Sequence, residues 1–254
     1  MSASEPTPEP TGATRADFGA TRPSVGESRS GGRELAAVLF DMDGLLVDTE
    51  HTWGIAELAV MTWLDHPHWS PADKAAMVGG PLPRVAAYMR QASGSRRPVE
   101  EIESYLVASM VDLLAHGADH RPGARDLLDD LAAHAIPCAL VSSSPRVLVD
   151  AVLSFVGGDH FVTTIAGDEV ARTKPFPDPY LLACRLLGVD PGDVIVLEDS
   201  PVGVAAAHAA GCLVVAVPFV VPIPDAPGRH VVGSLVDLDS ASLRALMART
   251  PTRW

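Results

Sequence analysis

AAVLFDMDG, residues 36–44, is the stretch that decides the fold, because an apolar run ends there in two aspartates and a glycine. Short apolar runs bounded by turn residues are typical of buried strands. Similar runs at 139–141 and 194–197 end in serines and in a Glu-Asp pair, and helical patterns separate them. Repeated β-α units of this kind indicate a mostly parallel sheet with helices on both faces. The sequence therefore predicts a doubly wound, Rossmann-like α/β fold.

The predicted elements alternate regularly in the second half of the chain. We expect helices at 124–133, 146–155, 178–187, 202–210 and 241–249, and strands at 137–141, 160–166, 194–197 and 213–217, with one more short strand near the end. In an open sheet of this type, ligands bind at the carboxyl ends of the strands. The polar clusters that follow the strands should therefore gather at one edge of the sheet.

Residues 50–118 separate the first strand from the next one and show helical rather than strand periodicity. Apolar residues within 102–114 recur at helical spacing, with a proline before them and a glycine just after, which marks both ends of a helix. A structureless loop of this length would be implausible in a compact domain. We therefore expect an inserted helical domain at 50–118 and a core domain formed by 34–49 and 119–254.

Composition limits the partners and the location. The net charge of −13 makes nucleic acid and anionic membranes unfavourable partners, and no apolar stretch is long enough to span a membrane. Residues 1–33 are rich in Ser, Thr, Pro and Gly without an apolar segment, which predicts a disordered tail rather than a signal peptide. Cys138, Cys184 and Cys212 lie far apart, which favours reduced thiols in a cytoplasmic protein.

Asp41 and Asp43 lie two residues apart at the end of the first predicted strand, and Gly44 allows a sharp turn after them. One carboxylate can attack phosphorus as a covalent nucleophile, while the other protonates the leaving oxygen and later takes a proton from water. We assign the first role to Asp41 and the second to Asp43. The pattern also occurs in plain turns and in calcium loops, although Leu45 and Val47 supply no oxygen ligands for calcium.

Glu198 and Asp199 follow the predicted strand at 194–197 and bring two more carboxylates to the same edge. Four carboxylates around a phosphate require positive charge, and a hard divalent ion with oxygen ligands, most simply Mg²⁺, supplies it. We expect Asp199 to hold the metal, with Asp41 opposite it. The alternative is that the acidic pair caps a helix that begins near Pro201, because acidic side chains favour helix N-termini.

Serine hydroxyls and one lysine could hold an anion at this edge. Ser142 and Ser143 precede a predicted helix, where hydroxyls and free backbone N–H groups form anion sites, and Ser144 is expected to cap that helix. Lys174 is one of only two lysines in a chain that otherwise uses arginine, which suggests a need for a compact point charge. A solvated lysine is the alternative for this position.

Together, four motifs resemble those of the haloacid dehalogenase superfamily of aspartyl-phosphate enzymes. The motifs are FDMDGLLVDTE (40–50), VSSS (141–144), TKPFPDPY (173–180) and VIVLEDSPVGVAAAHAAG (194–211). The resemblance covers nearly all of the chain after its first 34 residues. It implies that the helical insertion is a four-helix cap that opens and closes over an active site. It also implies Mg²⁺-dependent chemistry on a small phosphorylated metabolite.

The resemblance implies a role for each motif residue. Asp41 would be the nucleophile and Asp43 the general acid and base, and members that cleave carbon–halogen or phosphonate bonds lack an aspartate at position 43. Lys174 would also pair with Glu198. The residues expected at the phosphate are Ser142, Ser143 and Lys174; those at the metal are Asp41, Asp43 through its backbone carbonyl, and Asp199; and those in support are Glu198, Gly44 and Thr49.

The nearest branch of the superfamily contains sugar-phosphate phosphatases and β-phosphoglucomutase, and the sequence favours a phosphatase. Trp53 stands where the mutase pattern has a histidine, and Arg84 is out of register with the mutase's cap arginine. These two residues are our candidates for substrate contacts, although Trp53 could fill the cap core and Arg84 could be solvated. The mutase remains the alternative function, and a catalytically silent binder of phosphorylated metabolites is the more distant one.

Three further histidines lie near the predicted cap. His66-Pro-His68 has a spacing that could bind metal, but an exposed loop is the favoured interpretation, and His51 lies near the expected hinge. We expect the protein to be a monomer or a weak dimer.

Overall fold

The computed structural model describes residues 33–77 and 81–250 and confirms the predicted parallel sheet. The strands are β1 (Ala37–Phe40), β2 (Cys138–Val141), β3 (Thr163–Ile165), β4 (Val194–Glu198), β5 (Leu213–Ala216) and β6 (Arg229–Val231). Their order is β3-β2-β1-β4-β5-β6, and each is parallel to its neighbours. The strand order therefore reverses at β1, which is where open α/β sheets bind ligands. The tail predicted at 1–33 lies outside the described residues apart from Arg33.

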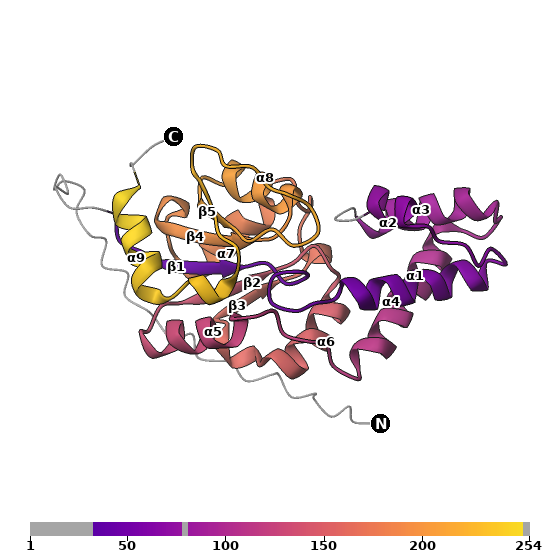
Figure 1. Cartoon of the computed structure of the whole chain (residues 1–254), viewed down its shortest axis with the longest axis horizontal. Coiled ribbons are helices and arrows are strands. Elements are labelled where there is room, and N and C mark those ends of the chain that lie inside the picture. Colours follow the sequence, from indigo (N-terminus) through magenta and orange to yellow (C-terminus); the bar gives the residue numbers. More distant parts are fainter. Residues whose placement is uncertain (1–32, 78–80, 251–254) are drawn as a thin grey trace, which may run out of the picture. The chain divides into compact units, whose positions relative to one another are not determined.

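Alternate residues of the strands belong to two separate hydrophobic clusters. The core helices are α5 (Ala124–Ala133), α6 (Arg146–Val156), α7 (Asp178–Leu187), α8 (Pro201–Ala209) and α9 (Ser240–Arg249). Val38 and Phe40 of β1 join the cluster that includes α5, α6 and α9, whereas Ala37 and Leu39 join the cluster that includes α7 and α8. Figure 1 shows α5 and α6 on one side of the sheet and α7 and α8 on the other. Strands covered on both faces are apolar at every position, which explains the unbroken apolar runs in the sequence.

Most predicted elements are present with ends shifted by at most one residue, and the strand predicted at 160–166 is the exception. A 3-10 helix occupies Gly158–His160, and β3 is limited to Thr163–Ile165. β3 is an edge strand that pairs with β2 alone. An edge strand is as long as its one partner allows, so the apolar pattern at 160–166 overestimates its length.

The predicted insertion folds into the helices α1 (Glu50–Trp63), α2 (Pro71–Met77), α3 (Leu82–Ser93) and α4 (Val99–Leu114). Of the periodic residues predicted in the last of these, Ile102, Leu106, Met110 and Leu114 form its buried face, whereas Tyr105 is exposed. Buried residues of this helical segment belong to the same hydrophobic cluster as Val38 and Phe40 of the sheet, and α4 packs against α6. The apolar core thus continues from the sheet into the helices, and the domain boundaries stay a prediction.

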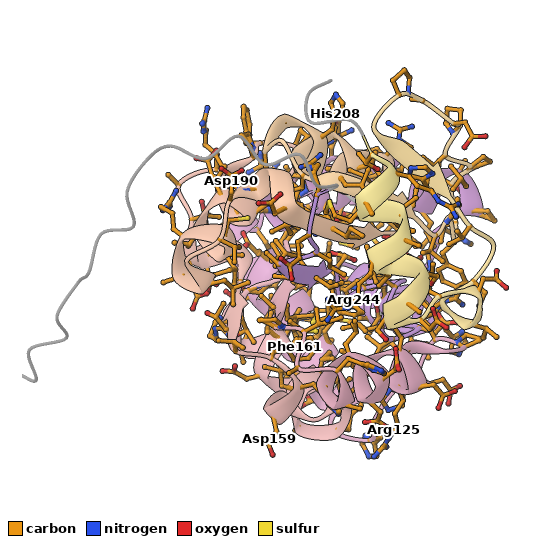
Figure 2. All side chains as sticks on the ribbon, turned by 90° about the vertical axis from the view of Figure 1, so that its left-hand side faces the viewer. Arg125, Asp159, Phe161, Asp190, His208 and Arg244 are labelled. Carbon is orange, nitrogen blue, oxygen red and sulfur yellow. The ribbon has the colours of Figure 1, made fainter. Side chains whose placement is uncertain are left out.

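Charged and apolar side chains separate as expected around the sheet. Figure 2 shows Arg125, Asp159 and Asp190 at the outside of the fold and Phe161 within it. The Phe161 ring packs edge to face against that of Phe40, with the ring centroids 6.1 Å apart. The cysteines are free and buried. Within the described ranges, none of the helices combines the length and the hydropathy that crossing a bilayer requires.

Candidate active site

The candidate catalytic side chains come from the carboxyl ends of three neighbouring parallel strands. β1 ends just before Asp41, β2 ends just before Ser142, and β4 ends with Glu198. The Asp41 backbone N–H donates to the Leu197 carbonyl at 3.1 Å, so pairing between strands continues to the first residue of the site. Strand register, rather than a loop, therefore fixes the spacing between these side chains.

Lys174 lies at the centre of the site with its side chain only 3% exposed. Its ammonium group donates to Asp41 Oδ1 at 2.5 Å, to Glu198 Oε1 at 2.6 Å and to the Val141 carbonyl at 2.9 Å, which uses all three of its donors. Burial acts to lower the pKa of Lys174, but the charges of Asp41 and Glu198 outweigh it and hold the pKa above its ordinary value. Lys174 is therefore a buried, fixed positive charge, and the solvated alternative is wrong.

Glu198 is fully buried and anchors Lys174. Its Oε1 also accepts the Tyr180 hydroxyl at 2.6 Å, and its Oε2 accepts the Ser200 hydroxyl at 3.1 Å. Gly203 lies against this carboxylate, and a Cβ at that position would collide with the carboxylate oxygens. Helix α8 is capped by Ser200, whose hydroxyl accepts the Gly203 N–H at 3.1 Å. The alternative that the acidic pair caps this helix is therefore wrong.

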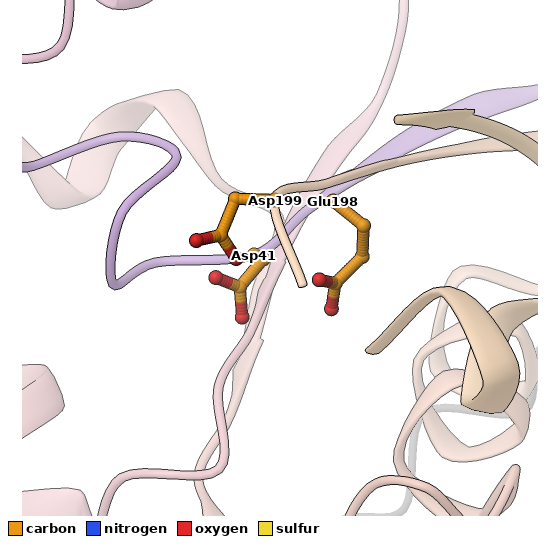
Figure 3. Close-up of side chains that lie close together, drawn as sticks. All are labelled: Asp41, Glu198 and Asp199. Carbon is orange, nitrogen blue, oxygen red and sulfur yellow. The ribbon is translucent and has the colours of Figure 1, made fainter. Parts of the chain in front are cut away.

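Three carboxylates form a cluster beside Lys174. Asp41, Glu198 and Asp199 each place an oxygen within 4.8 Å of the others (Figure 3). Burial raises the pKa of Asp41 to about 7, with Lys174 opposing the rise and Glu198 adding to it. Burial and the charges of Asp41 and Glu198 raise the pKa of Asp199 to about 9. One ammonium does not balance this negative charge, and a bound divalent cation would relieve the excess.

Gly44 allows the aspartate pair and Asp199 to lie close together. Its φ is +83°, a conformation that side chains other than glycine's rarely adopt. A Cβ at this position would also collide with the Asp199 carboxylate. Both the backbone and the close approach require glycine here, in agreement with the predicted turn.

Asp43 is held by hydroxyl groups on both of its carboxylate oxygens. The Thr49 hydroxyl donates to Oδ1 at 2.7 Å, and the Ser144 hydroxyl donates to Oδ2 at 2.9 Å. The Ser142 hydroxyl lies farther from the same oxygen, at 3.5 Å. These bonds fix the orientation of the Asp43 carboxylate next to Asp41.

The predicted cap role of Ser144 is wrong. Helix α6 has Pro145 at its N-cap and no side-chain hydrogen bond there. Because the helix begins at Arg146, the Ser144 hydroxyl is free to donate to the Asp43 carboxylate, which is a stronger acceptor than a neutral group. Its backbone N–H donates to the Ser142 hydroxyl at 3.0 Å, which ties the two serines together. Ser143 lies between them and is exposed.

A cavity connects this edge of the sheet with helices α1, α2 and α3. Core residues that line it are Asp41, Asp43, Ser143, Ser144, Lys174, Asp199, Ser200 and Val202, and helical residues that line it are Glu50, Trp53, Glu57, Lys74, Met77, Leu82 and Val85. Four predicted residues do not line the cavity but contact residues that do: Ser142, Gly44, Thr49 and Glu198. Of the two cap candidates, Trp53 lines the cavity, whereas Arg84 is exposed and lies outside its lining.

The three histidines that the sequence analysis considered in the helical segment lie outside this site. His51 is exposed and does not line the cavity. The rings of His66 and His68 are 6.0 Å apart, in the loop between α1 and α2. Neither belongs to the one carboxylate cluster that could hold a metal among the described residues.

Several residues of the site have no role in the sequence analysis. Tyr180 lies inside a quoted motif, but nothing in the pattern reveals that its hydroxyl binds a buried carboxylate. Gly203 could have been suspected, since a glycine inside a helical pattern often marks close packing. Lys74 could have been suspected as the second of only two lysines. Glu57 carries no recognisable signal, because a glutamate within a helical stretch is normally solvated.

Comparison with known proteins agrees with this geometry. A family model described as a haloacid dehalogenase-like hydrolase matches residues 35–211. Protein CbbY of Rhodobacter capsulatus is 34% identical over 196 residues, which are 73% of this chain and 86% of that protein. Hexitol phosphatase B of Escherichia coli K12 is 32% identical over 223 residues, which are 85% and 96% of the two chains. The crystal structure of CbbY from Rhodobacter sphaeroides in complex with phosphate matches with a TM-score of 0.73 at 28% identity, covering 82% of this chain and 99% of that one.

Proposed function

The chain belongs to the haloacid dehalogenase-like hydrolase family, and on that premise we propose that it is a Mg²⁺-dependent phosphatase that hydrolyses a sugar phosphate or a similar small phosphate monoester. The reaction would proceed through phosphorylated Asp41. Relatives named as phosphatases support the hydrolytic reaction. The observation that carries the proposal is the buried contact of Lys174 with Asp41 and Glu198 beside Asp43.

In the first step, a carboxylate oxygen of Asp41 attacks phosphorus, and the bond between phosphorus and the ester oxygen breaks. Asp43 gives its proton to the leaving alcohol, so the product departs neutral. The fixed charge of Lys174 lies 2.5 Å from Asp41 Oδ1 and stabilises the negative charge of the transferring group. Ser143 lines the cavity, and we assign its hydroxyl to donate to the phosphoryl oxygens.

In the second step, water attacks the phosphorus of the phosphorylated aspartate. Asp43, deprotonated by the first step, takes a proton from that water, and the bond to the Asp41 oxygen breaks to release inorganic phosphate. The hydrogen bonds from Thr49 and Ser144 keep the Asp43 carboxylate in one orientation for both transfers. Atoms and charges then return to their starting state.

The residues at the sheet edge fit a magnesium ion. Asp41 and Asp199 offer carboxylate oxygens, and the Asp43 backbone carbonyl is the third protein ligand that we propose. Glu198 belongs to the same cluster, but Lys174, Tyr180 and Ser200 already occupy its oxygens, so we assign it to anchoring. When bound, the ion would neutralise charge on the phosphoryl oxygens and leave Asp41 ionised.

The test is release of inorganic phosphate by the purified full chain with Mg²⁺. The substrates are p-nitrophenyl phosphate and a set of hexose and hexitol monophosphates. We expect turnover of the first and faster turnover of at least one of the others. A chain that releases phosphate from none of them would contradict the proposed function.

A further inference from the structure

The chain contains only two lysines, and both line the same cavity. Lys174 lies among the catalytic candidates, whereas Lys74 lies on helix α2 with Glu50 and Glu57 of α1 nearby in the lining. These three residues are called the α1–α2 wall here. Cationic residues elsewhere in the chain are all arginines. The wall is therefore a second polar surface that the hydrolytic reaction itself does not use.

Lys74 is bound to α1 but keeps one donor open. Its ammonium group donates to the Glu50 backbone carbonyl at 2.6 Å and lies 3.2 Å from Glu50 Oε2. A Cβ at Gly54 would lie 3.3 Å from the Lys74 nitrogen, so glycine leaves room for this approach. An ammonium group has three donors, and these two contacts leave one for a ligand in the cavity.

Glu57 is a buried carboxylate with one open acceptor. The residue is 7% exposed, and its Oε2 accepts the Trp69 indole N–H at 2.7 Å. Its Oε1 accepts no hydrogen bond from the described residues, although the side chain lines the cavity. Because the Glu57 side chain lines the cavity, a ligand inside the cavity can donate a hydrogen bond to this oxygen.

The wall is held in place before any ligand arrives. At the start of α2, the Ser70 N–H donates to Asp73 Oδ2 at 2.9 Å and the Asp73 N–H donates to the Ser70 hydroxyl at 3.2 Å. The Tyr88 hydroxyl of α3 donates to the same Asp73 at 2.6 Å, and the Tyr88 ring packs edge to face on Trp69. Prepositioned groups lose little entropy on binding a ligand.

We propose that the α1–α2 wall binds the hydroxyl groups of an uncharged polyol leaving group and rejects substrates that carry a second anionic group. The proposal rests on the phosphatase function proposed above and names the substrate class of the same site. A hydroxyl can donate to Glu57 Oε1 and accept from Lys74, so it satisfies both open positions. The Trp53 ring supplies an apolar surface beside them for the C–H face of a sugar or hexitol.

The α1–α2 wall would repel a second phosphate or carboxylate group on the substrate. Among the described residues, the wall presents two carboxylates and one ammonium, and that ammonium is already paired with Glu50. An added anion would face net negative charge in a partly desolvated place, which opposes binding. Arg84, which the sequence suggests as a substrate contact, is exposed and lies outside the lining. The same argument disfavours the bisphosphate that a sugar-phosphate mutase must hold.

The test compares kcat/KM for glucitol 6-phosphate, glucose 6-phosphate and glucose 1,6-bisphosphate, with p-nitrophenyl phosphate as a reference that has no polyol. For the wild type, we expect the better monophosphate to exceed the bisphosphate at least about tenfold. In Glu57→Gln, the amide oxygen can still accept from Trp69, but an NH₂ group replaces the open acceptor. The ratio of kcat/KM for the better monophosphate to that for p-nitrophenyl phosphate should fall about tenfold, mainly through KM.

Glu50→Gln is the second variant, because Glu50 is partly exposed and its replacement should not disturb folding. We expect the ratio of kcat/KM for the better monophosphate to that for the bisphosphate to decrease, because the α1–α2 wall loses one negative charge. Glu100→Gln is the matched control, an exposed carboxylate on α4 outside the cavity lining, and it should leave both ratios unchanged. Equal hydrolysis of the bisphosphate, or unchanged ratios in Glu57→Gln and Glu50→Gln, would overturn this inference and leave the phosphatase function standing. Hydrolysis of no substrate, including p-nitrophenyl phosphate, would overturn both.

Discussion

At the sheet edge of the cavity, Lys174 is 3% exposed and makes all of its hydrogen bonds within the protein. At the helical side, Lys74 is 29% exposed and keeps one donor open. The first lysine is fixed by groups at the ends of β1, β2 and β4, and the second by Glu50 of α1. A group that must stabilise a transition state benefits from rigid burial, whereas a group that recognises a leaving group needs an accessible partner position. We infer that the sheet edge performs the reaction and the helices choose the substrate.

The largest effect is expected for Asp41→Asn. An amide is a poor nucleophile, so turnover should fall by about 10⁴-fold or more, on the scale of losing a catalytic nucleophile. The fold should remain intact, because Glu198 still pairs with Lys174. Phosphate release and circular dichroism measure the two properties. Activity within tenfold of the wild type would remove Asp41 from the reaction.

The position of Asp41 shows what a sequence can reveal. β1 is apolar at every position because helices cover both of its faces, so its end is easy to locate. Parallel strands then bring their carboxyl ends to one edge, which places Asp41, Ser142 and Asp199 together without knowledge of any side-chain contact. The same reasoning could not assign Ser144, because its role depends on a helix that starts two residues beyond it, with Pro145 at the N-cap.

The helical side could not be predicted in this way. Helical periodicity identifies which residues of α1 are buried, but it does not say which of them face a cavity that lies between three helices. Glu57 is an example, since a glutamate on an amphipathic helix is normally solvated and here is 7% exposed. Arg84 shows the opposite error: the sequence offers it as a substrate contact, but the structure leaves it exposed to solvent. Such contacts depend on tertiary packing that no local pattern encodes.

Removal of magnesium should have the next largest effect. We expect a chelator to reduce phosphate release to background and added Mg²⁺ to restore it, because the carboxylate cluster carries more negative charge than Lys174 balances. Millimolar Mg²⁺ should also raise the melting temperature by a few degrees, as a ligand specific to the folded state does. Asp199→Asn should lose both responses, and Asp159→Asn, which replaces an exposed carboxylate elsewhere, should keep them. Full activity in the chelator would contradict the metal assignment.

The two lysines offer the most direct contrast between the sheet edge and the helices. Lys174→Ala should lower kcat by about 10²-fold or more, the scale of losing one preorganised donor, and should destabilise the fold, because Asp41 and Glu198 lose their shared partner. Lys74→Ala should instead raise KM for the best sugar phosphate by about tenfold, with the smaller change in kcat. Steady-state kinetics separates the two. A loss under tenfold in Lys174→Ala, or equal losses of kcat in both variants, would break the division of roles.

The smallest effect is expected for Tyr180→Phe. The substitution removes one hydrogen bond to Glu198 and leaves those from Lys174 and Ser200 in place. We expect a loss of about 1–3 kcal/mol in the free energy of unfolding, the usual cost of a hydrogen bond to a charged group, and a fall in kcat of less than about tenfold. Urea denaturation and phosphate release give the two numbers. An unchanged unfolding free energy would mean that Tyr180 does not help to hold the Glu198 carboxylate.

The proposed function depends on phosphorylation of Asp41 during turnover. p-Nitrophenolate is a good leaving group that needs no acid, so the first step can still occur in Asp43→Asn with p-nitrophenyl phosphate. The second step lacks its general base, so the phosphorylated enzyme should accumulate. Quenching with borohydride reduces an aspartyl phosphate to homoserine, which peptide mass spectrometry can locate. We expect homoserine at position 41 only when the substrate and Mg²⁺ are both present. If the wild type turns over the substrate but position 41 is unmodified in every quenched sample of Asp43→Asn, the covalent mechanism is wrong. Modification at another residue would also contradict the assignment of Asp41.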